Sequence, residues 1–300
     1  MSISQKRREF RLRITYPTLA KLPPVVAYAF ADLLGRRDAR SNHDLRVALG
    51  NGFDKAMPGL TADARENLIR EQALMLSREV MDAWLLPRLD ARTLGSMVTV
   101  DNVAALEEAR SEGKGVLLIM AHYSRLVLLL AALGARGFEM GMLTMRIDEA
   151  NPDLLPCERR YLSQKVSALR AMLRGGWVSL GDPMRPLYEG LRRGEIWIVL
   201  LDAYHSEFGR QMDYPFLDGE LSLPSGIDRI MAKTGARAVF ASVRENGPRR
   251  LRGRFTRLPD DPASVMAAAV SELEVDVRAA PAQWWQWNIL DYLWNRGGRE

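Results

Sequence analysis

Apolar and polar residues follow one another along the chain in blocks that predict alternating strands and helices. Runs of four to six apolar residues bounded by glycine or polar residues are typical of strands that are buried on both faces of a sheet. Apolar residues spaced three and four apart predict amphipathic helices. Because the two patterns alternate from about residue 98 onwards, we predict an α/β fold with a mostly parallel central sheet flanked by helices.

The expected elements can be given as residue ranges. Strands are predicted at 98–100, 115–121, 140–144, 177–180, 196–201, 238–243 and 251–255. Helices are predicted at 102–109, 124–135, 158–173, 183–193, 224–234 and 262–277. The last strand is more polar than the others, so we place it nearer an edge of the sheet. The segment between residue 202 and residue 224 is predicted to be a loop.

The first third of the chain predicts helices only. A periodic apolar pattern runs from Thr61, a plausible N-cap, to about Leu89. We therefore expect residues 1–95 to form a helical N-terminal extension and residues 96–300 to form the α/β domain, the two together making one compact unit.

One apolar segment, residues 19–34, has basic residues on both sides. It is shorter than the roughly 20 apolar residues that a membrane-spanning helix needs. A helix lying in a membrane interface and a helix packed on the domain both fit the pattern, and the sequence does not choose between them. The flanking basic residues are Lys6, Arg7, Arg8, Arg11 and Arg13 on one side and Arg36, Arg37 and Arg40 on the other.

Net charge and cysteine content limit which binding partners and which cellular compartments we expect for the chain. The formal net charge is +5 and the isoelectric point is near 9.5, which suits anionic partners such as membrane surfaces, acidic carrier proteins or phosphorylated lipids. No recognisable nucleic-acid-binding module accompanies the charge, so we expect no nucleic-acid partner. Cys157 is the only cysteine, which excludes an intrachain disulfide and is compatible with the cytosol. We expect no secretory signal peptide.

Motifs for common cofactors are missing. The two glycines at 113 and 115 precede a predicted strand instead of following it, so they do not form a dinucleotide fingerprint. There is no phosphate-binding P-loop and no G-x-S-x-G elbow. The three histidines, His43, His122 and His205, are scattered along the chain. We therefore expect neither a metal nor a redox cofactor.

Two of the apolar predicted strands are each followed directly by a polar residue. His122 follows the strand 115–121, and Asp202 follows the strand 196–201. In open α/β sheets, ligands bind at the carboxyl edge, where these residues would lie. A histidine there can take a proton from an attacking hydroxyl or amine if another group orients its second ring nitrogen. A core histidine and a turn-capping aspartate are the alternatives.

The same stretch resembles a known family. Gly113-Lys114-Gly115-Val116 and Ala121-His122 resemble the signature strand of the lysophospholipid acyltransferase superfamily, and most closely its lipid A biosynthesis branch. Further matches follow in register. They are Thr144-Met145-Arg146, Leu187–Glu195 with Asp202, Tyr214–Gly219, Pro224–Gly226, Thr234–Ala236, and Pro281–Trp284 with Trp287. The resemblance covers roughly residues 20 to 290 and implies transfer of an acyl group from a thioester, carried by acyl carrier protein or coenzyme A, to a hydroxyl at the cytoplasmic face of the inner membrane.

The sequence departs from the family motif at its acidic position. The motif is a histidine, four residues, and then an acidic residue, but here the last position is Val127. Three hypotheses follow. Asp202, or less plausibly Glu207, orients His122; or His122 works without a partner on an easily activated acceptor, as in an enzyme of specialised metabolism; or catalysis is lost and the fold binds a lipid or a carrier.

Other polar residues near the predicted strand ends are candidates for substrate contacts. Arg146 is the preferred anion or oxyanion ligand, and Arg125 is a candidate for contacting a phosphate or a phosphopantetheine group. Tyr123 and Ser124 are candidates for shaping the pocket. The acceptor, a lipid or a small molecule, is not specified by any of them.

Overall fold

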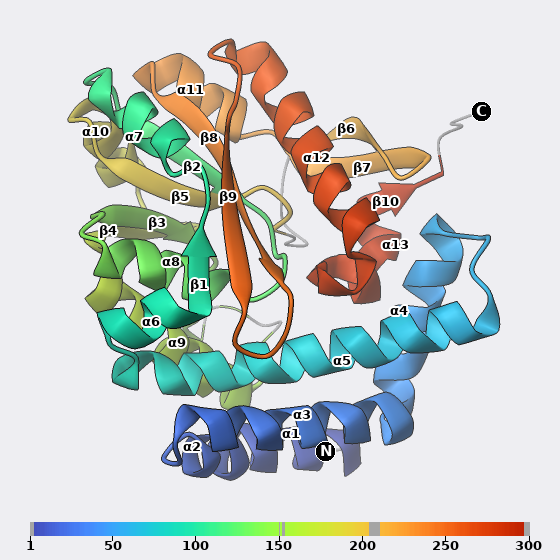
Figure 1. Ribbon diagram of the computed structural model, residues 1–300. Coiled ribbons are helices and arrows are strands. Elements are labelled where there is room, and N and C mark those ends of the chain that lie inside the picture. The colour runs from blue at the N-terminus through green and yellow to red at the C-terminus, as the bar shows by residue number, and fades with distance from the viewer. Residues whose placement is uncertain (1–2, 150, 152–153, 204–210, 297–300) are drawn as a thin grey trace.

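The central element of the computed structural model is a seven-stranded sheet with strand order β1-β9-β8-β2-β5-β3-β4 (Figure 1). Every neighbouring pair in it is parallel except β8 and β9. Helices cover both faces, and the chain enters through a helical N-terminal region, so the predicted fold class is confirmed. The structure describes residues 3–149, 151, 154–203 and 211–296.

Most predicted elements appear within a few residues of their expected bounds. The strands of the large sheet are β1 (Val98–Val100), β2 (Val116–Met120), β3 (Met140–Thr144), β4 (Arg174–Ser179), β5 (Ile196–Leu200), β8 (Arg237–Glu245) and β9 (Leu251–Arg257). The helices that accompany them are α7 (Ala104–Ser111), α8 (Leu126–Ala135), α9 (Pro156–Leu173), α10 (Arg185–Arg192), α11 (Ile227–Thr234) and α12 (Pro262–Ala279). The polar strand β9 is second from the edge, because the short β1 covers it.

The strands at the centre of the sheet are buried on both faces, and alternate residues enter two different cores. In β2, Val116, Leu118 and Met120 pack with α8 on one face, whereas Leu117 and Ile119 pack with α10, α11 and α12 on the other. The two-residue repeat of a strand imposes this division.

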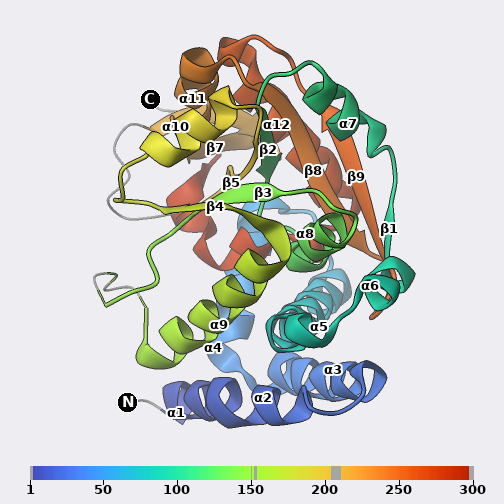
Figure 2. The same cartoon turned by 90° about the vertical axis from the view of Figure 1, so that its left-hand side faces the viewer.

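The N-terminal region is a layer of helices beneath the sheet domain (Figure 2). It comprises α1 (Ile3–Phe10), the π-helix η1 (Arg11–Thr15), α2 (Tyr16–Leu19), α3 (Pro24–Ser41), α4 (His43–Ala56), α5 (Ala62–Leu85), the 3₁₀-helix η2 (Leu86–Arg88) and α6 (Ala91–Met97). Thr61 caps α5 through its side chain, as predicted. Among the described residues, no helix has both the length and the apolar character needed to cross a membrane.

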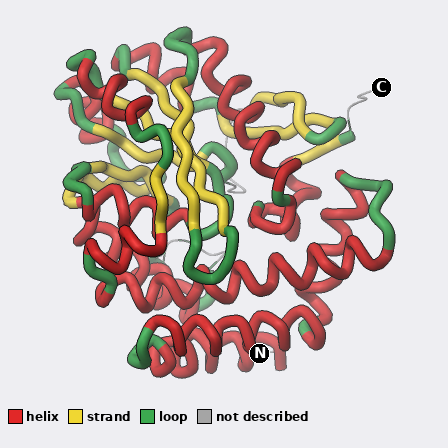
Figure 3. Tube along the Cα trace, in the orientation of Figure 1, coloured by secondary structure: helices red, strands yellow, loops and turns green. Residues whose placement is uncertain are grey.

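The interval that was predicted to be a loop contains a hairpin, so that prediction is wrong. Strands β6 (Gln211–Phe216) and β7 (Gly219–Pro224) pair with β10 (Trp294–Asn295) in a second, three-stranded sheet. The hairpin turns at Leu217 and Asp218, which have φ values of 49° and 60°. A two-residue turn with both φ values positive is usually signalled by Asn-Gly, and neither residue type is present here. Figure 3 shows this small sheet beside the C-terminal helical segments, which are η3 (Pro281–Gln283), η4 (Trp285–Ile289) and α13 (Leu290–Leu293).

Contact between α3 and α5 depends on a glycine. A Cβ atom at Gly35 would lie 2.8 Å from the carbonyl oxygen of Ala73 and 2.8 Å from the Cα of Leu74, both in α5. We predict that Gly35→Ala lowers the free energy of unfolding by about 1–3 kcal/mol, because it forces the two backbones apart. Chemical denaturation measures the effect.

Gly95 in α6 supplies the matched control, because a Cβ there meets nothing within 4 Å. Gly95→Ala should stabilise the protein by roughly 0.5–1 kcal/mol through helix propensity alone. Equal effects of the two substitutions would contradict the close packing of α3 on α5.

Candidate functional site

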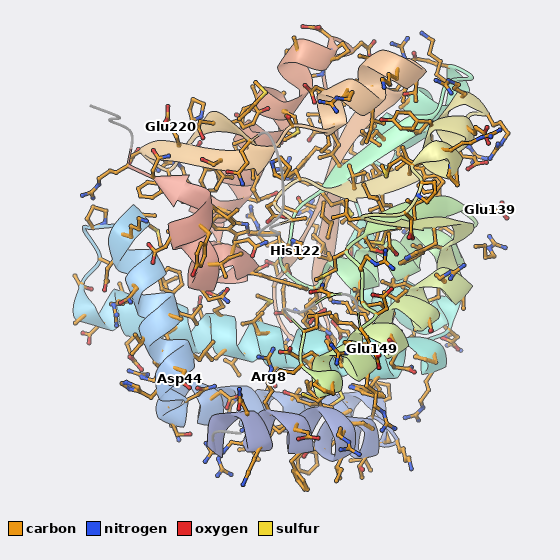
Figure 4. The ribbon with its side chains drawn as sticks, turned by 180° about the vertical axis from the view of Figure 1, so that it is seen from behind. Arg8, Asp44, His122, Glu139, Glu149 and Glu220 are labelled. Carbon is orange, nitrogen blue, oxygen red and sulfur yellow. The ribbon has the colours of Figure 1, made fainter. Side chains whose placement is uncertain are left out.

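Strand register brings His122 and Asp202 together. In the parallel pair β2–β5, Met120 is the partner of Leu200. Each polar residue lies two positions beyond its strand's last paired residue, so both side chains leave the sheet at the same level and toward the same face. The Nδ1 atom of His122 is 3.0 Å from Oδ1 of Asp202. Figure 4 shows His122 near the centre of the molecule, seen from behind.

The Asp202 carboxylate is fully buried and is satisfied by several donors. The backbone N–H of His122 donates to both carboxylate oxygens, at 2.9 and 3.1 Å, and Nε1 of Trp284 donates to Oδ2 at 2.9 Å. Because an ionised carboxylate can only accept hydrogen bonds, the 3.0 Å contact requires that the proton of neutral His122 is on Nδ1. This tautomer leaves the Nε2 lone pair available to a ligand, and the His122 side chain is 25% exposed.

A sharp turn after β2 sends consecutive side chains in different directions. Ser124 has φ of +50°, a strained value for a residue with a Cβ, and its backbone N–H donates to the carbonyl of Gln283 at 2.6 Å. Tyr123 is buried in the core shared with Trp284, and its hydroxyl donates to the carbonyl of Asp276 at 2.9 Å. Burial raises the pKa of Tyr123. The Ser124 side chain is also buried. Neither lies on an accessible pocket wall, contrary to the prediction for these two residues.

The C-terminal 3₁₀ segment forms the other side of the site. Trp285 lies beside the His122 ring, with centroids 5.4 Å apart and planes inclined at 48°, and its backbone N–H donates to the carbonyl of His122 at 2.9 Å. Gln286 donates through Nε2 to the backbone carbonyl of Asp202 at 2.7 Å and lies 3.2 Å from Nδ1 of His122. Since a protonated Nδ1 cannot accept a hydrogen bond, that second contact is packing. The sequence patterns gave no reason to select Gln286, because its partners are far away in the chain.

Arg125 was predicted to contact a ligand, but the structure places it in the interior. Its side chain has no exposed surface. Its guanidinium group makes a bidentate pair with Asp82, at 2.6 and 2.7 Å, and a third bond to Glu245 at 2.8 Å. It also lies 4.6 Å from the ring centroid of Tyr28. With these partners it ties the turn after His122 to α3 and α5.

The opposite charges in this buried cluster stabilise each other's ionised forms. Burial raises the pKa of Asp82 to about 6, against the opposing attraction of Arg125. The two hydrogen bonds from Arg125 favour the ionised form of this carboxyl group. Although burial disfavours the charged form, Asp82 and Glu245 raise the pKa of Arg125 well above its ordinary value. Glu245 also pairs with Arg78 at 3.2 Å. The cluster links helix α5, the turn after β2 and the end of β8.

The remaining predicted contacts lie elsewhere. Arg146 follows β3 and is 40% exposed, with a bond of 2.8 Å to Asp148 and a distance of 3.7 Å to Asp182. Glu207 lies outside the described residues. Val127, at the acidic position of the family motif, is buried in α8 within the apolar core. Within the described chain, no group of three or more histidine, cysteine or acidic side chains is arranged to hold a metal ion.

The buried ion pairs of Arg125 generate a stability prediction. Arg125→Met would leave the buried carboxylate of Asp82 without an ion-pair partner and Glu245 with Arg78 alone, so we expect a loss of about 3–5 kcal/mol in the free energy of unfolding, measured by chemical denaturation. Arg185→Met, which removes an exposed pair with Glu189, is the control and should have no measurable effect. A loss below about 1 kcal/mol for Arg125→Met would mean that the cluster does not stabilise the fold.

Comparison with known proteins identifies the family. No curated protein matches the chain significantly. The family model for bacterial lipid A biosynthesis acyltransferases matches residues 12–290, which include every strand of the large sheet and both residues of the buried histidine–aspartate contact. The chain therefore belongs to the bacterial lipid A biosynthesis acyltransferase family.

Proposed function

We propose that this protein transfers an acyl group from a carrier-protein or coenzyme A thioester to a hydroxyl or amine, with His122 as the general base. Family membership indicates acyltransferase activity. The observation that carries the residue assignment is the 3.0 Å contact between the Asp202 carboxylate and Nδ1 of His122. It supports the first of the three hypotheses about the departure from the motif, in which Asp202 is the orienting carboxylate.

The reaction follows from the tautomer. Nε2 of His122 takes the proton of the acceptor as its oxygen or nitrogen attacks the thioester carbonyl carbon. The imidazolium that forms is stabilised by Asp202, to which Nδ1–H continues to donate. When the tetrahedral intermediate collapses, the carbon–sulfur bond breaks and the leaving thiolate takes the proton from Nε2. The products are the acylated acceptor and the free thiol of the carrier, and the histidine is neutral again.

Arg146 is the proposed contact for an anionic part of the donor. It follows β3 near the carboxyl edge of the sheet, and its pKa is raised by the hydrogen bond with Asp148. A phosphate of the phosphopantetheine arm or of coenzyme A would have to compete with Asp148 and Asp182 for the guanidinium group. The proposed carrier is acyl carrier protein, and the proposed location is the cytoplasmic side of the inner membrane.

The packing of Val127 supports the hypothesis that Asp202 takes the place of the motif acid over the hypothesis that the acid was lost without a substitute. Val127 has no exposed surface and belongs to the same apolar core as Leu126 and Leu130. A carboxylate in that place would require a polar partner. Asp202 instead follows β5, the strand paired with β2, and its carboxylate accepts hydrogen bonds from His122 and Trp284. The alternative of an enzyme of specialised metabolism, in which His122 works without a partner on a carrier-bound intermediate, is less well supported because Asp202 lies 3.0 Å from Nδ1 of His122.

Two substitutions test the assignment. We expect His122→Ala to abolish acyl transfer while the fold is retained, because the base is removed. Asp202→Asn should lower kcat by about 10⁴, the effect of neutralising the aspartate in a Ser-His-Asp triad. Steady-state kinetics with a panel of acyl-carrier and acyl-coenzyme A thioesters measures both, and circular dichroism verifies folding.

Matched controls remove the same groups from the surface. His43→Ala and Asp218→Asn change exposed residues and should leave kcat unaltered. If wild-type protein and His122→Ala consumed every thioester equally, the enzyme proposal would fail. Retained binding of lipid or carrier by both proteins would then identify a binding scaffold.

Val127→Glu tests whether the motif position itself is still usable. We predict that it destabilises the protein by several kcal/mol and does not raise kcat, because the new carboxylate enters an apolar core and His122 already has a partner. Val127→Ile is the apolar control and should cost less than about 1.5 kcal/mol. Thermal denaturation and the same kinetic assay give both readouts. A rise in kcat with Val127→Glu would show that Asp202 is not the functional orienting group.

A further inference from the structure

Trp285 contacts the strained turn after β2 at two of its carbonyl groups. Its backbone N–H donates to the carbonyl of His122 at 2.9 Å, and its indole Nε1–H donates to the carbonyl of Ser124 at 2.7 Å. The indole ring also lies beside the imidazole ring of His122, with the two centroids 5.4 Å apart. The position of this one indole therefore restricts the orientation of the His122 side chain.

Lys165 in α9 covers the indole of Trp285. The ammonium nitrogen of Lys165 lies over the indole ring, 5.0 Å from its centroid. A cation within about 6 Å of the centroid is attracted by the electrons of the ring, and more strongly where water is excluded. The Lys165 side chain is only 12% exposed, so water is largely excluded here. Trp285 is itself only partly buried, so the apolar core alone does not fix the position of its ring.

A buried carboxylate, that of Glu79 in α5, holds the ammonium group of Lys165 in place. It accepts a hydrogen bond from that ammonium group and another, at 3.0 Å, from the hydroxyl of Tyr161. Tyr161 and Lys165 are four residues apart, so they lie on one face of α9. Burial and the charge of Glu79 raise the pKa of Tyr161 well above its ordinary value, so the hydroxyl remains a donor. Lys165 cannot leave this place without stranding a buried charge.

Helix α5 supports Trp285 in a second way. Gln72 and Glu79 are seven residues apart and therefore lie on one side of α5. The side-chain amide of Gln72 donates to the carbonyl of Trp284, the residue before Trp285, at 2.9 Å. Figure 2 shows α5 and α9 side by side beneath the large sheet. The two helices thus hold both the backbone next to Trp285 and the cation that covers its ring.

We propose that Lys165, anchored by Glu79, is a positioning residue for His122. It keeps the indole of Trp285 against the imidazole, and that contact holds the imidazole in the orientation in which Nδ1–H donates to Asp202 and Nε2 is available to the acceptor. The inference rests on the proposed function, because the orientation of His122 affects the reaction only if His122 is the base. Misplacing a catalytic group by about 1 Å can lower a rate roughly 10²-fold.

The alternative is that the Glu79–Lys165 pair only joins two helices. A buried pair can do so wherever it lies, and removing one partner destabilises the fold because the other charge is left unpaired. Neutralising both partners together avoids that penalty. The test therefore uses the double variant Lys165→Met with Glu79→Gln, which keeps side chains of similar length and an acceptor for the hydroxyl of Tyr161. In this variant the indole loses its cation while the contact between the helices is retained.

Two measurements on the full-length protein test the proposal. In protein labelled with ¹⁵N-histidine, NMR reports which ring nitrogen carries the proton, and His122→Ala identifies the His122 signals among those of the three histidines. The wild type should show the Nδ1–H tautomer, whereas the double variant should show both tautomers, because its imidazole is free to turn away from Asp202. In steady-state kinetics, the double variant should have kcat lowered about 10- to 100-fold and KM within about twofold of the wild type, since orientation of the base acts on the reaction step and not on substrate binding.

A conservative variant and a second ion pair supply the controls. Lys165→Arg keeps a cation over the indole and a partner for Glu79, so it should retain the wild-type spectrum and kcat. Arg11→Met with Asp38→Asn removes a pair of similar burial, with side chains 14% and 17% exposed, that joins η1 to α3 away from His122. This second double variant should leave both the spectrum and kcat unchanged.

An unchanged His122 spectrum in the variant Lys165→Met with Glu79→Gln would overturn the proposal, whatever its kcat. A Lys165→Arg variant as impaired as that double variant would also overturn it, because the cation would then not be the cause. If the wild type transferred no acyl group to any acceptor while the two spectra differed as expected, the acyl-transfer proposal would fail and the positioning of His122 by Lys165 would stand.

Discussion

The buried carboxylate of Asp202 is the contact on which the organisation of the site depends. It accepts hydrogen bonds from the backbone and ring of His122 and from the indole of Trp284, so it joins β5, the end of β2 and the C-terminal segment at one point. A buried carboxylate without these donors would be costly, and a histidine without the carboxylate would have no preferred tautomer. The same contact therefore stabilises the geometry of the site and places the proton of neutral His122 on Nδ1.

A second buried charge, Arg125, connects that site to the N-terminal helices. Its partners Asp82 and Glu245 come from α5 and β8. The backbone N–H of Glu245 donates to the side-chain oxygen of Gln283, and the backbone carbonyl of Gln283 accepts the N–H of Ser124. The strained turn at Ser124 is thus held from both sides. Asp82 of α5 and Tyr28 of α3 both contact the Arg125 guanidinium group, so these two helices support the site together.

The predictions from sequence succeeded where local patterns decide structure and failed where distant segments do. The apolar runs of β2 and β5 and the polar residues that close them were sufficient to predict the sheet and to place His122 and Asp202 at one edge. The hairpin β6–β7 was missed because its turn uses Leu217 and Asp218 without the usual glycine signal. Arg125 was a candidate for contacting a ligand because it lies close to His122 in the sequence. Its burial depends on Asp82, which is 43 residues away in the chain.

The sequence by itself determined the α/β class and the family, and it placed His122 at the end of a strand, because strand and helix periodicity and a motif of adjacent residues are local properties. Only the tertiary structure decided which carboxylate contacts that histidine. Eighty residues separate His122 from Asp202, and their 3.0 Å contact exists because parallel register aligns Met120 with Leu200. The tertiary structure also decided that Val127 belongs to the core, because the surroundings of a helix residue are set by the elements that pack on it. The acidic half of the motif is absent from the sequence at its usual position, and the carboxylate that contacts His122 belongs to Asp202, which follows the neighbouring strand.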